Sequence, residues 1–195
     1  MPQLVQKTAI DRQIIQQGLT WVDFKLIQKG LENSSGLRLS YYAGIVEIFM
    51  PGKEHELFKS ILGHLLELFF LAKGIEYQPT GSMTQEREGL VSLQADESYC
   101  IGAVKPIPDL AIEVIVSSGN LQKLQQYQVL EIPEVWFWED GLLQAYHLCP
   151  QGYERVGHSE IPALAELDFD LLTGCVRQVE TSTVEAARQF WQGIQ

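Results

Sequence analysis

The stretch Asp109-Leu-Ala-Ile-Glu-Val-Ile-Val116 decides the fold class of this chain. Between its two ends every side chain except Glu113 is apolar, which predicts a strand that lies inside a sheet and is covered on both faces. Strands of this kind occur in α/β domains, where helices pack on the faces of the sheet. A carboxylate is costly to bury in such a strand unless it is paired, protonated or bound to a cation. Glu113 therefore marks a candidate functional position.

The segments on either side of this strand predict an α/β layout. Thr20 and Asp23 form a capping-box pattern, which predicts the start of a helix that ends near Glu32. Tight hairpin turns are expected at Ala43-Gly44 and Asp140-Gly141, the first between strands over 37–42 and 45–50, the second between strands over 134–138 and 142–148. Apolar spacing and breaker residues predict further helices over 53–73, 119–130 and 183–191, and strands over 75–78, 96–101 and 153–157. We expect an α/β fold with a mixed β-sheet flanked by helices, in a single domain over 1–195.

The composition limits the class of protein. A chain of 195 residues with 46% hydrophobic and 20% charged residues is typical of one globular domain. Its apolar runs are shorter than the ~20 residues of a membrane-spanning helix, and its amino-terminal segment lacks the pattern of an export signal. The three cysteines form no CxxC pair, so we expect reduced thiols in a cytoplasmic protein. The net charge of −11 opposes nonspecific binding of nucleic acids.

Two carboxylates on successive predicted strands suggest a metal site. Asp96 begins the strand before that of Glu113, so the two side chains are able to meet and offer the oxygen ligands that Mg²⁺ prefers. Lys123 lies near the start of the following helix, where it would orient a water molecule or offset phosphate charge. Glu56 opens the long helix beside His55 and would add a third carboxylate or a general base.

Structural explanations exist for each of these residues. Glu113 is equally explained as a buried acid held by Lys123 or by a backbone amide. Asp96 could simply begin a strand, and Lys123 and Glu56 could be solvated helix residues. His55 and His64 are expected to be a surface and an interface histidine, because neither has a partner at the usual spacing of metal ligands.

Four segments carry a resemblance to a known family. In chain order they are Gln94-Ala-Asp96-Glu-Ser-Tyr-Cys, Pro108-Asp-Leu-Ala-Ile-Glu113-Val-Ile, Lys123-Leu-Gln-Gln-Tyr127 and Ile132-Pro-Glu-Val-Trp136. With these segments in this order, the chain resembles the Uma-type restriction endonuclease family. This family has no assigned substrate and belongs to the PD-(D/E)XK nuclease superfamily. The resemblance covers about 19–172 and implies a restriction-endonuclease-like core sheet flanked by helices.

The resemblance also implies a metal site where Asp96 meets Glu113. The superfamily often places a lysine two residues after the second acid, but here that position is Ile115, and Lys123 would replace it. Position 95 is alanine where the family usually has proline, a change that affects chain stiffness more than chemistry. Asp109 lies four residues before Glu113 and is expected on the same face of the strand, as an outer residue of the site.

We therefore expect a metal-dependent endonuclease that cleaves DNA with Mg²⁺ or Mn²⁺ held by Asp96 and Glu113. Lys123 would position the attacking water and Glu56 would assist, in a homodimer that cuts two strands. The superfamily also contains domains that have lost catalysis, so the alternative is a noncatalytic protein-interaction or scaffold domain, which the negative charge and Ile115 favour. Hydrolysis of a small phosphorylated substrate fits the charge, but the chain has no Gly-rich phosphate loop.

Overall fold

The fold is described by a computed structural model over residues 10–115 and 120–195. The helices are α1 (Trp21–Gly30), α2 (Lys53–Lys73), α3 (Asn120–Leu130), α4 (Phe169–Gln178) and α5 (Thr183–Gly193), with a short 3-10 helix at Pro162–Leu164. The strands are β1 (Arg12–Gln17), β2 (Arg38–Tyr42), β3 (Ile45–Met50), β4 (Tyr77–Pro79), β5 (Thr84–Arg87), β6 (Val91–Gln94), β7 (Glu97–Ile101), β8 (Leu110–Ile115), β9 (Glu134–Glu139), β10 (Leu142–Cys149) and β11 (Gly152–Val156).

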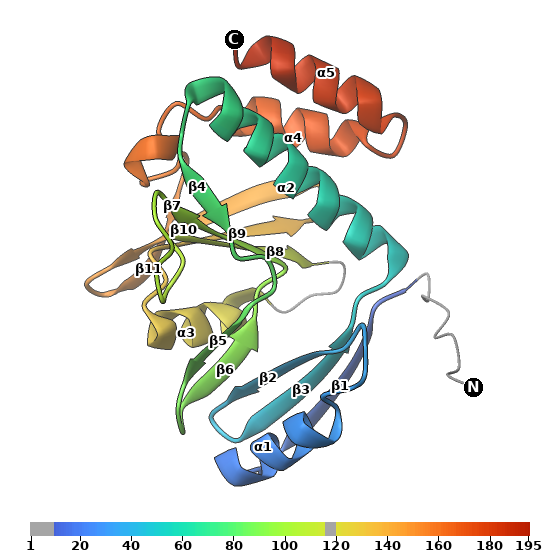
Figure 1. The fold of residues 1–195 in the computed structure, drawn as a ribbon, viewed down its shortest axis with the longest axis vertical. Helices are drawn as coiled ribbons and strands as arrows, with labels where there is room; N and C mark the ends of the chain where they lie inside the picture. Colours follow the sequence, from blue (N-terminus) through green and yellow to red (C-terminus); the bar gives the residue numbers. More distant parts are fainter. Residues whose placement is uncertain (1–9, 116–119) are drawn as a thin grey trace.

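A six-stranded sheet in the order β11-β10-β9-β8-β7-β4 forms the centre of the molecule (Figure 1). Strands β8 and β9 run parallel, and α3 makes the crossover between them that parallel strands require. Strand β8 is buried on both faces, as its apolar sequence predicts. Ile112 and Val114 pack in the core shared with α2, α4 and α5, and Ala111 packs in the core under α3.

A second sheet of five antiparallel strands, in the order β1-β3-β2-β6-β5, lies beside the first (Figure 1). Helix α1 packs on it through Phe24, which contacts the rings of Trp21 and Tyr41. The α/β fold class is confirmed, and the six-stranded sheet is the expected mixed sheet flanked by helices. The described residues also form the second sheet, which the sequence did not predict, and the hairpin over 37–50 lies at its centre.

Several elements lie outside what the sequence predicts, for local reasons. Strand β1 is fully exposed, and its sequence RQIIQQ lacks the polar and apolar alternation of a half-buried strand. Strands β5 and β6 have four residues each, which is too few to show a period. Helix α4 contains Gly174 in its interior, which weakens the helical signal.

The local signals that the sequence analysis used are confirmed where the structure describes them. Ala43 and Gly44 have φ of 49° and 79°, and Asp140 and Gly141 have φ of 51° and 73°, as primed hairpin turns require. Thr20 makes the full capping box with Asp23. The end of the predicted strand at Val116 and the predicted helix start at Gly119 lie outside the described residues. Within the described chain, no helix is long and apolar enough to span a membrane.

Candidate active site

Asp96 lies immediately before β7 and is attached to the strand that carries Glu113. Its backbone amide donates a hydrogen bond to the carbonyl oxygen of Ile112 at 3.1 Å, and its Oδ2 accepts one from the amide of Val114 at 2.6 Å. Ile112 and Val114 are the two neighbours of Glu113 in β8. The structure thus brings the two predicted acids to adjacent strands, and both are buried, at 1% and 2% exposed.

The other oxygen of Asp96 faces two basic side chains. Arg38, the first residue of β2, forms an ion pair with Oδ1 through Nη1. His55, in the first turn of α2, places Nε2 at 2.9 Å from the same oxygen. The ring of His55 is 1% exposed, so the expectation of a surface histidine is wrong. The helix turns this face toward the second sheet, where the ring of Phe49 covers the imidazole at a centroid distance of 5.3 Å.

His55 is neutral at physiological pH. Burial first, and then nearby positive charges, that of Arg38 foremost, together lower its pKa to about 3. A neutral imidazole carries one proton, and the bond to Asp96 uses it when it lies on Nε2. Nδ1 has no hydrogen-bond partner among the described residues and faces Oδ2 of Asp11 at 3.5 Å. The ring is therefore a positioning group for Asp96 rather than a counter-charge.

Glu113 is held by two residues of α3. Lys123 Nζ donates to Oε2 at 2.8 Å, and the hydroxyl of Tyr127 makes a short hydrogen bond to Oε1. Lys123 and Tyr127 are four residues apart, so they project from the same face of the helix. Burial first, and then the charge of Glu113, raise the pKa of the Tyr127 hydroxyl, which keeps it a donor.

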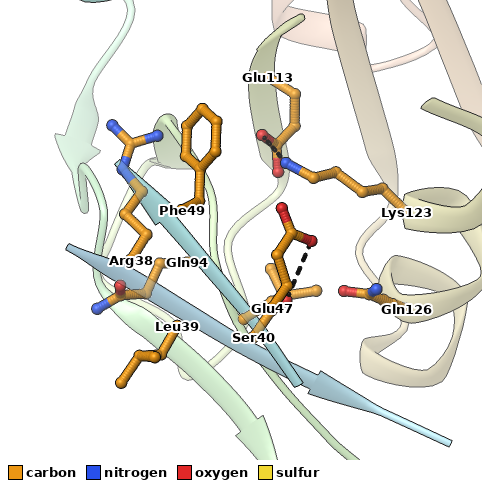
Figure 2. A pocket seen from close by; sticks show the side chains of 10 residues that line it. Arg38, Leu39, Ser40, Glu47, Phe49, Gln94, Glu113, Lys123 and Gln126 are labelled. Atoms are coloured by element: carbon orange, nitrogen blue, oxygen red, sulfur yellow. Dashed lines mark hydrogen bonds and ion pairs between the residues drawn. The ribbon is translucent and has the colours of Figure 1, made fainter. Parts of the chain in front are cut away.

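A small pocket lies between the two sheets at this point. It has a volume of about 20 Å³ and is lined by Arg38, Glu47, Phe49, Glu113 and Lys123 among others, and a space of this size holds about one water molecule. Figure 2 shows Lys123 reaching Glu113, with the carboxylate of Glu47 pointing from β3 toward that pair. The second sheet therefore supplies part of the site.

The remaining predicted site residues lie at different distances from the two acids. Glu56 Oε1 is 3.5 Å from Nη2 of Arg38, so Glu56 is linked to Asp96 through the guanidinium. Asp109 binds the amide of Ile101 and the ammonium of Lys105, both at 2.7 Å. It precedes β8, roughly 13 Å from Glu113 at ~3.3 Å per residue, so its assignment as an outer residue of the site is wrong.

His64 is likewise not part of an interface within the chain. Its side chain is exposed, although the residues on both sides of it in α2 are buried. Because α2 packs only one stripe against the central sheet, a position on the opposite face stays in solvent. The side chain of His64 is therefore not packed between elements of the described chain.

The carboxylate oxygens of Asp96 and Glu113 are chemically suited to bind a divalent cation. Among residues 10–115 and 120–195, no three His, Cys, Asp or Glu side chains converge as a ready ligand set. Each acid nevertheless has one oxygen anchored by an uncharged donor, the Val114 amide or the Tyr127 hydroxyl, and one oxygen opposed by a positive charge. Carboxylate oxygens of this kind are the ligands that Mg²⁺ and Mn²⁺ take.

Sequence reasoning missed Arg38, Glu47 and Tyr127 at this site. Tyr127 was detectable, because the Lys-x-x-x-Tyr spacing on a helix places both side chains over the same strand. Arg38 and Glu47 gave no signal, since they come from a hairpin that reaches the acids only when the two sheets meet.

Comparisons with known proteins concern the family and the fold of this chain. Residues 21–179 match the family described as "Uma2: Putative restriction endonuclease". A crystal structure of "a putative nuclease belonging to DUF820" from Anabaena variabilis ATCC 29413 has a similar fold, with a TM-score of 0.55 and 14% sequence identity over 88% of this chain and 99% of that chain. A comparison with curated proteins finds no match. The structural similarity concerns the fold alone, but the family match spans most of the sequence, and the chain therefore belongs to the Uma2 family.

Proposed function

We propose that this protein is a metal-dependent nuclease that hydrolyses phosphodiester bonds in DNA. One observation carries the proposal: Asp96 and Glu113 are both buried, Asp96 is bonded to the backbone of the residues on either side of Glu113, and each acid presents one oxygen to a long positively charged side chain. Two buried carboxylates are costly unless they are paired, protonated or compensated by cations, and here each has a positively charged partner. A site that already holds cations against these oxygens is suited to hold a metal ion there.

In this proposal Asp96 and Glu113 hold Mg²⁺ or Mn²⁺. When bound, such an ion supplies positive charge that polarises a phosphodiester and acidifies water. Lys123 positions the attacking water in the pocket beside Glu113, which has room for about one water molecule. His55 keeps the carboxylate of Asp96 oriented, and Glu56 assists through its contact with Arg38.

The choice of DNA as the substrate rests on the family description, with local charge in its support. The chain has a net charge of −11, so a polyanion must be attracted by the site and not by the whole surface. Arg38 and Lys123 bring positive charge to the two acids, and Lys59 lies beside Glu97, the residue after Asp96. This local charge is consistent with a phosphate that approaches the pocket.

The proposal includes a homodimer, in which each copy of the protein cuts one strand of the DNA duplex. Strand β1 forms an edge of the second sheet, where Ile14 and Ile15 are 55% and 53% exposed. An open strand edge with exposed apolar side chains is a favourable surface for pairing with a second copy. Light scattering at micromolar protein concentration distinguishes the dimer from the monomer.

A noncatalytic scaffold domain is the second candidate, and the same contacts favour it. Every carboxylate oxygen of Asp96 and Glu113 already has a partner within the chain, as in a structural network that stabilises the meeting of two sheets. Metal binding separates the two candidates, because a structural network has no need of an added ion.

The test is a titration of Mg²⁺ and of Mn²⁺ while thermal stability is followed. An ion present at about 100 times its Kd stabilises the folded state by about 2.7 kcal/mol, which corresponds to a rise of several degrees in Tm for a domain of this size. We expect the rise in wild type and in Glu134→Gln, a control in which an equally buried acid of the same sheet is changed, and not in Glu113→Gln. No rise in wild type up to millimolar metal would favour the scaffold.

Activity is then measured on linear and circular DNA in the presence of the ion that binds. Asp96→Asn should lose metal-dependent cleavage, while Glu134→Gln should retain it. Full cleavage by Asp96→Asn would remove Asp96 from the proposed site.

A further inference from the structure

We propose that Arg38 is a resident counter-cation of the site, which leaves Asp96 when a divalent metal ion binds and then pairs with Glu56. The inference rests on the proposed function, because it takes Asp96 as a metal ligand. It concerns regulation of metal affinity by a residue of the second sheet, a role that neither the carboxylates nor Lys123 supplies.

The two oxygens of Asp96 have different partners, and this difference identifies the exchangeable one. Oδ2 accepts the amide of Val114 at 2.6 Å, a backbone bond that fixes the carboxylate to β8. Oδ1 is shared by the Arg38 guanidinium and the neutral ring of His55. Arg38 is therefore the positive charge in direct contact with Asp96 among the described residues. A metal ion that binds Oδ1 has to compete with that charge.

Arg38 also has an alternative partner within reach. Its Nη2 already lies 3.5 Å from Oε1 of Glu56, in the first turn of α2. The side chain of Glu56 is 24% exposed, against 1% for Asp96. Moving the guanidinium from Asp96 to Glu56 keeps it paired and carries it toward solvent, so the exchange leaves no unpaired charge in the interior.

The position of Arg38 in the fold is also compatible with a move of its guanidinium from Asp96 to Glu56. It is the first residue of β2, and its side chain is 13% exposed and lines the pocket beside Glu113 and Lys123. A long side chain at the end of a strand has rotamer freedom that a side chain in the middle of the core lacks. By contrast, Tyr127 is completely buried, so the bond that anchors Glu113 stays in place.

The experiment measures Mn²⁺ binding directly, from the loss of the electron paramagnetic resonance signal of free Mn²⁺. Arg38→Met keeps the apolar stem and removes the charge, whereas Arg38→Lys keeps a charge. An adjacent opposite charge changes the proton affinity of a carboxylate by about 10- to 1,000-fold. By the same competition we expect Arg38→Met to lower the Kd for Mn²⁺ by about tenfold or more, and Arg38→Lys to change it by less than about threefold.

A double-mutant cycle tests the role of Glu56. If Glu56 receives the displaced guanidinium, Glu56→Gln raises the Kd in the wild-type background and has no effect in the Arg38→Met background. Glu54→Gln is the matched control, because it removes one carboxylate from the same first turn of α2, and its exposed side chain lies outside the pocket of Glu113. Should Arg38→Met fail to fold, a larger effect of Glu56→Gln than of Glu54→Gln still supports the exchange, and equal effects overturn it.

The outcomes separate this inference from the proposed function. In one outcome, wild type binds Mn²⁺, Asp96→Asn abolishes the binding, and Arg38→Met leaves the Kd unchanged. This outcome overturns the exchange but keeps the metal site. Absence of Mn²⁺ binding in wild type and in Arg38→Met overturns both. A tighter Kd in Arg38→Met, lost again in the double variant Arg38→Met with Asp96→Asn, supports both.

Discussion

The hydroxyl of Tyr127 offers a quantitative test of the charge on Glu113. Tyr127→Phe removes a buried donor from Oε1 of Glu113, and the matched variant Tyr153→Phe removes a partly buried donor from the backbone carbonyl of Ile132 at 2.5 Å. Hydrogen bonds to charged groups contribute about 1.5–3 kcal/mol and those between neutral groups about 0.5–1.5 kcal/mol. Both rings pack in the core under α3, so the two variants differ mainly in the acceptor.

We therefore expect Tyr127→Phe to lower the free energy of unfolding by about 2 kcal/mol and Tyr153→Phe by about 1 kcal/mol. The first corresponds to a fall in Tm of roughly 4–8 °C at about 2–4 °C per kcal/mol. Urea unfolding at pH 7, followed by tryptophan fluorescence, measures both variants without added metal.

The reasoning would be refuted by a loss in Tyr127→Phe that is no larger than the loss in Tyr153→Phe. A second check uses Glu113→Gln as the background, in which Tyr127→Phe should cost no more than a neutral hydrogen bond does, about 1 kcal/mol. An unchanged cost in that background would mean that the phenol stabilises the fold through its packing and not through the carboxylate.

Three further predictions concern pH, a second buried acid and a helix terminus. The folded pKa of His55 is about 3 against 6.5 in the unfolded chain, so the unfolded state binds its proton first and the metal-free protein loses stability as pH falls from about 6.5 toward 3. The loss should approach about 1.4 kcal/mol per pH unit, and chelator-treated His55→Asn should show a shallower slope in urea unfolding across this window. Ser159→Ala removes a 2.7 Å hydrogen bond to the completely buried Glu134 and should cost about 1–3 kcal/mol, with no change in the Kd for Mn²⁺; a changed Kd would contradict the separation of this acid from the site. Thr20→Ala removes the hydroxyl that accepts a hydrogen bond from the amide of Asp23 and donates one to its carboxylate, and it should cost about 1 kcal/mol in the same unfolding assay.

Local sequence signals determined most of the secondary structure. The sequence predicted α2 over 53–73, with Gly74 at φ 64° as its end, because periodic apolar residues and a left-handed terminal residue act within a few turns of chain. Both hairpin turns were predicted for the same reason. The family resemblance over about 19–172 was confirmed by the match over 21–179, since the motifs that carry it lie in order along the chain.

The sequence also identified the two acids, although by different signals. Glu113 was conspicuous because a carboxylate interrupts an apolar strand, and Asp96 became a candidate through its place on the preceding strand. Their partners were harder to predict. Lys123 was expected from the motif, while His55 was assigned to the surface because nothing in its own segment shows that α2 turns this residue toward Asp96.

The sequence by itself predicted the fold class and the buried strand, and it singled out the two acids as candidates. It did so because burial produces patterns of apolar and polar residues that can be recognised within a short segment. Only the tertiary structure decided that the described residues form two sheets and that the hairpin of β2 and β3 in one sheet meets the acids of the other. The packing of the two sheets brings Arg38 to Asp96, which lies 58 residues later in the sequence, and brings Glu47 to the pocket of Glu113. Contacts between residues so far apart in the sequence depend on how complementary surfaces pack. The local order of residues along the chain does not show which surfaces will pack together.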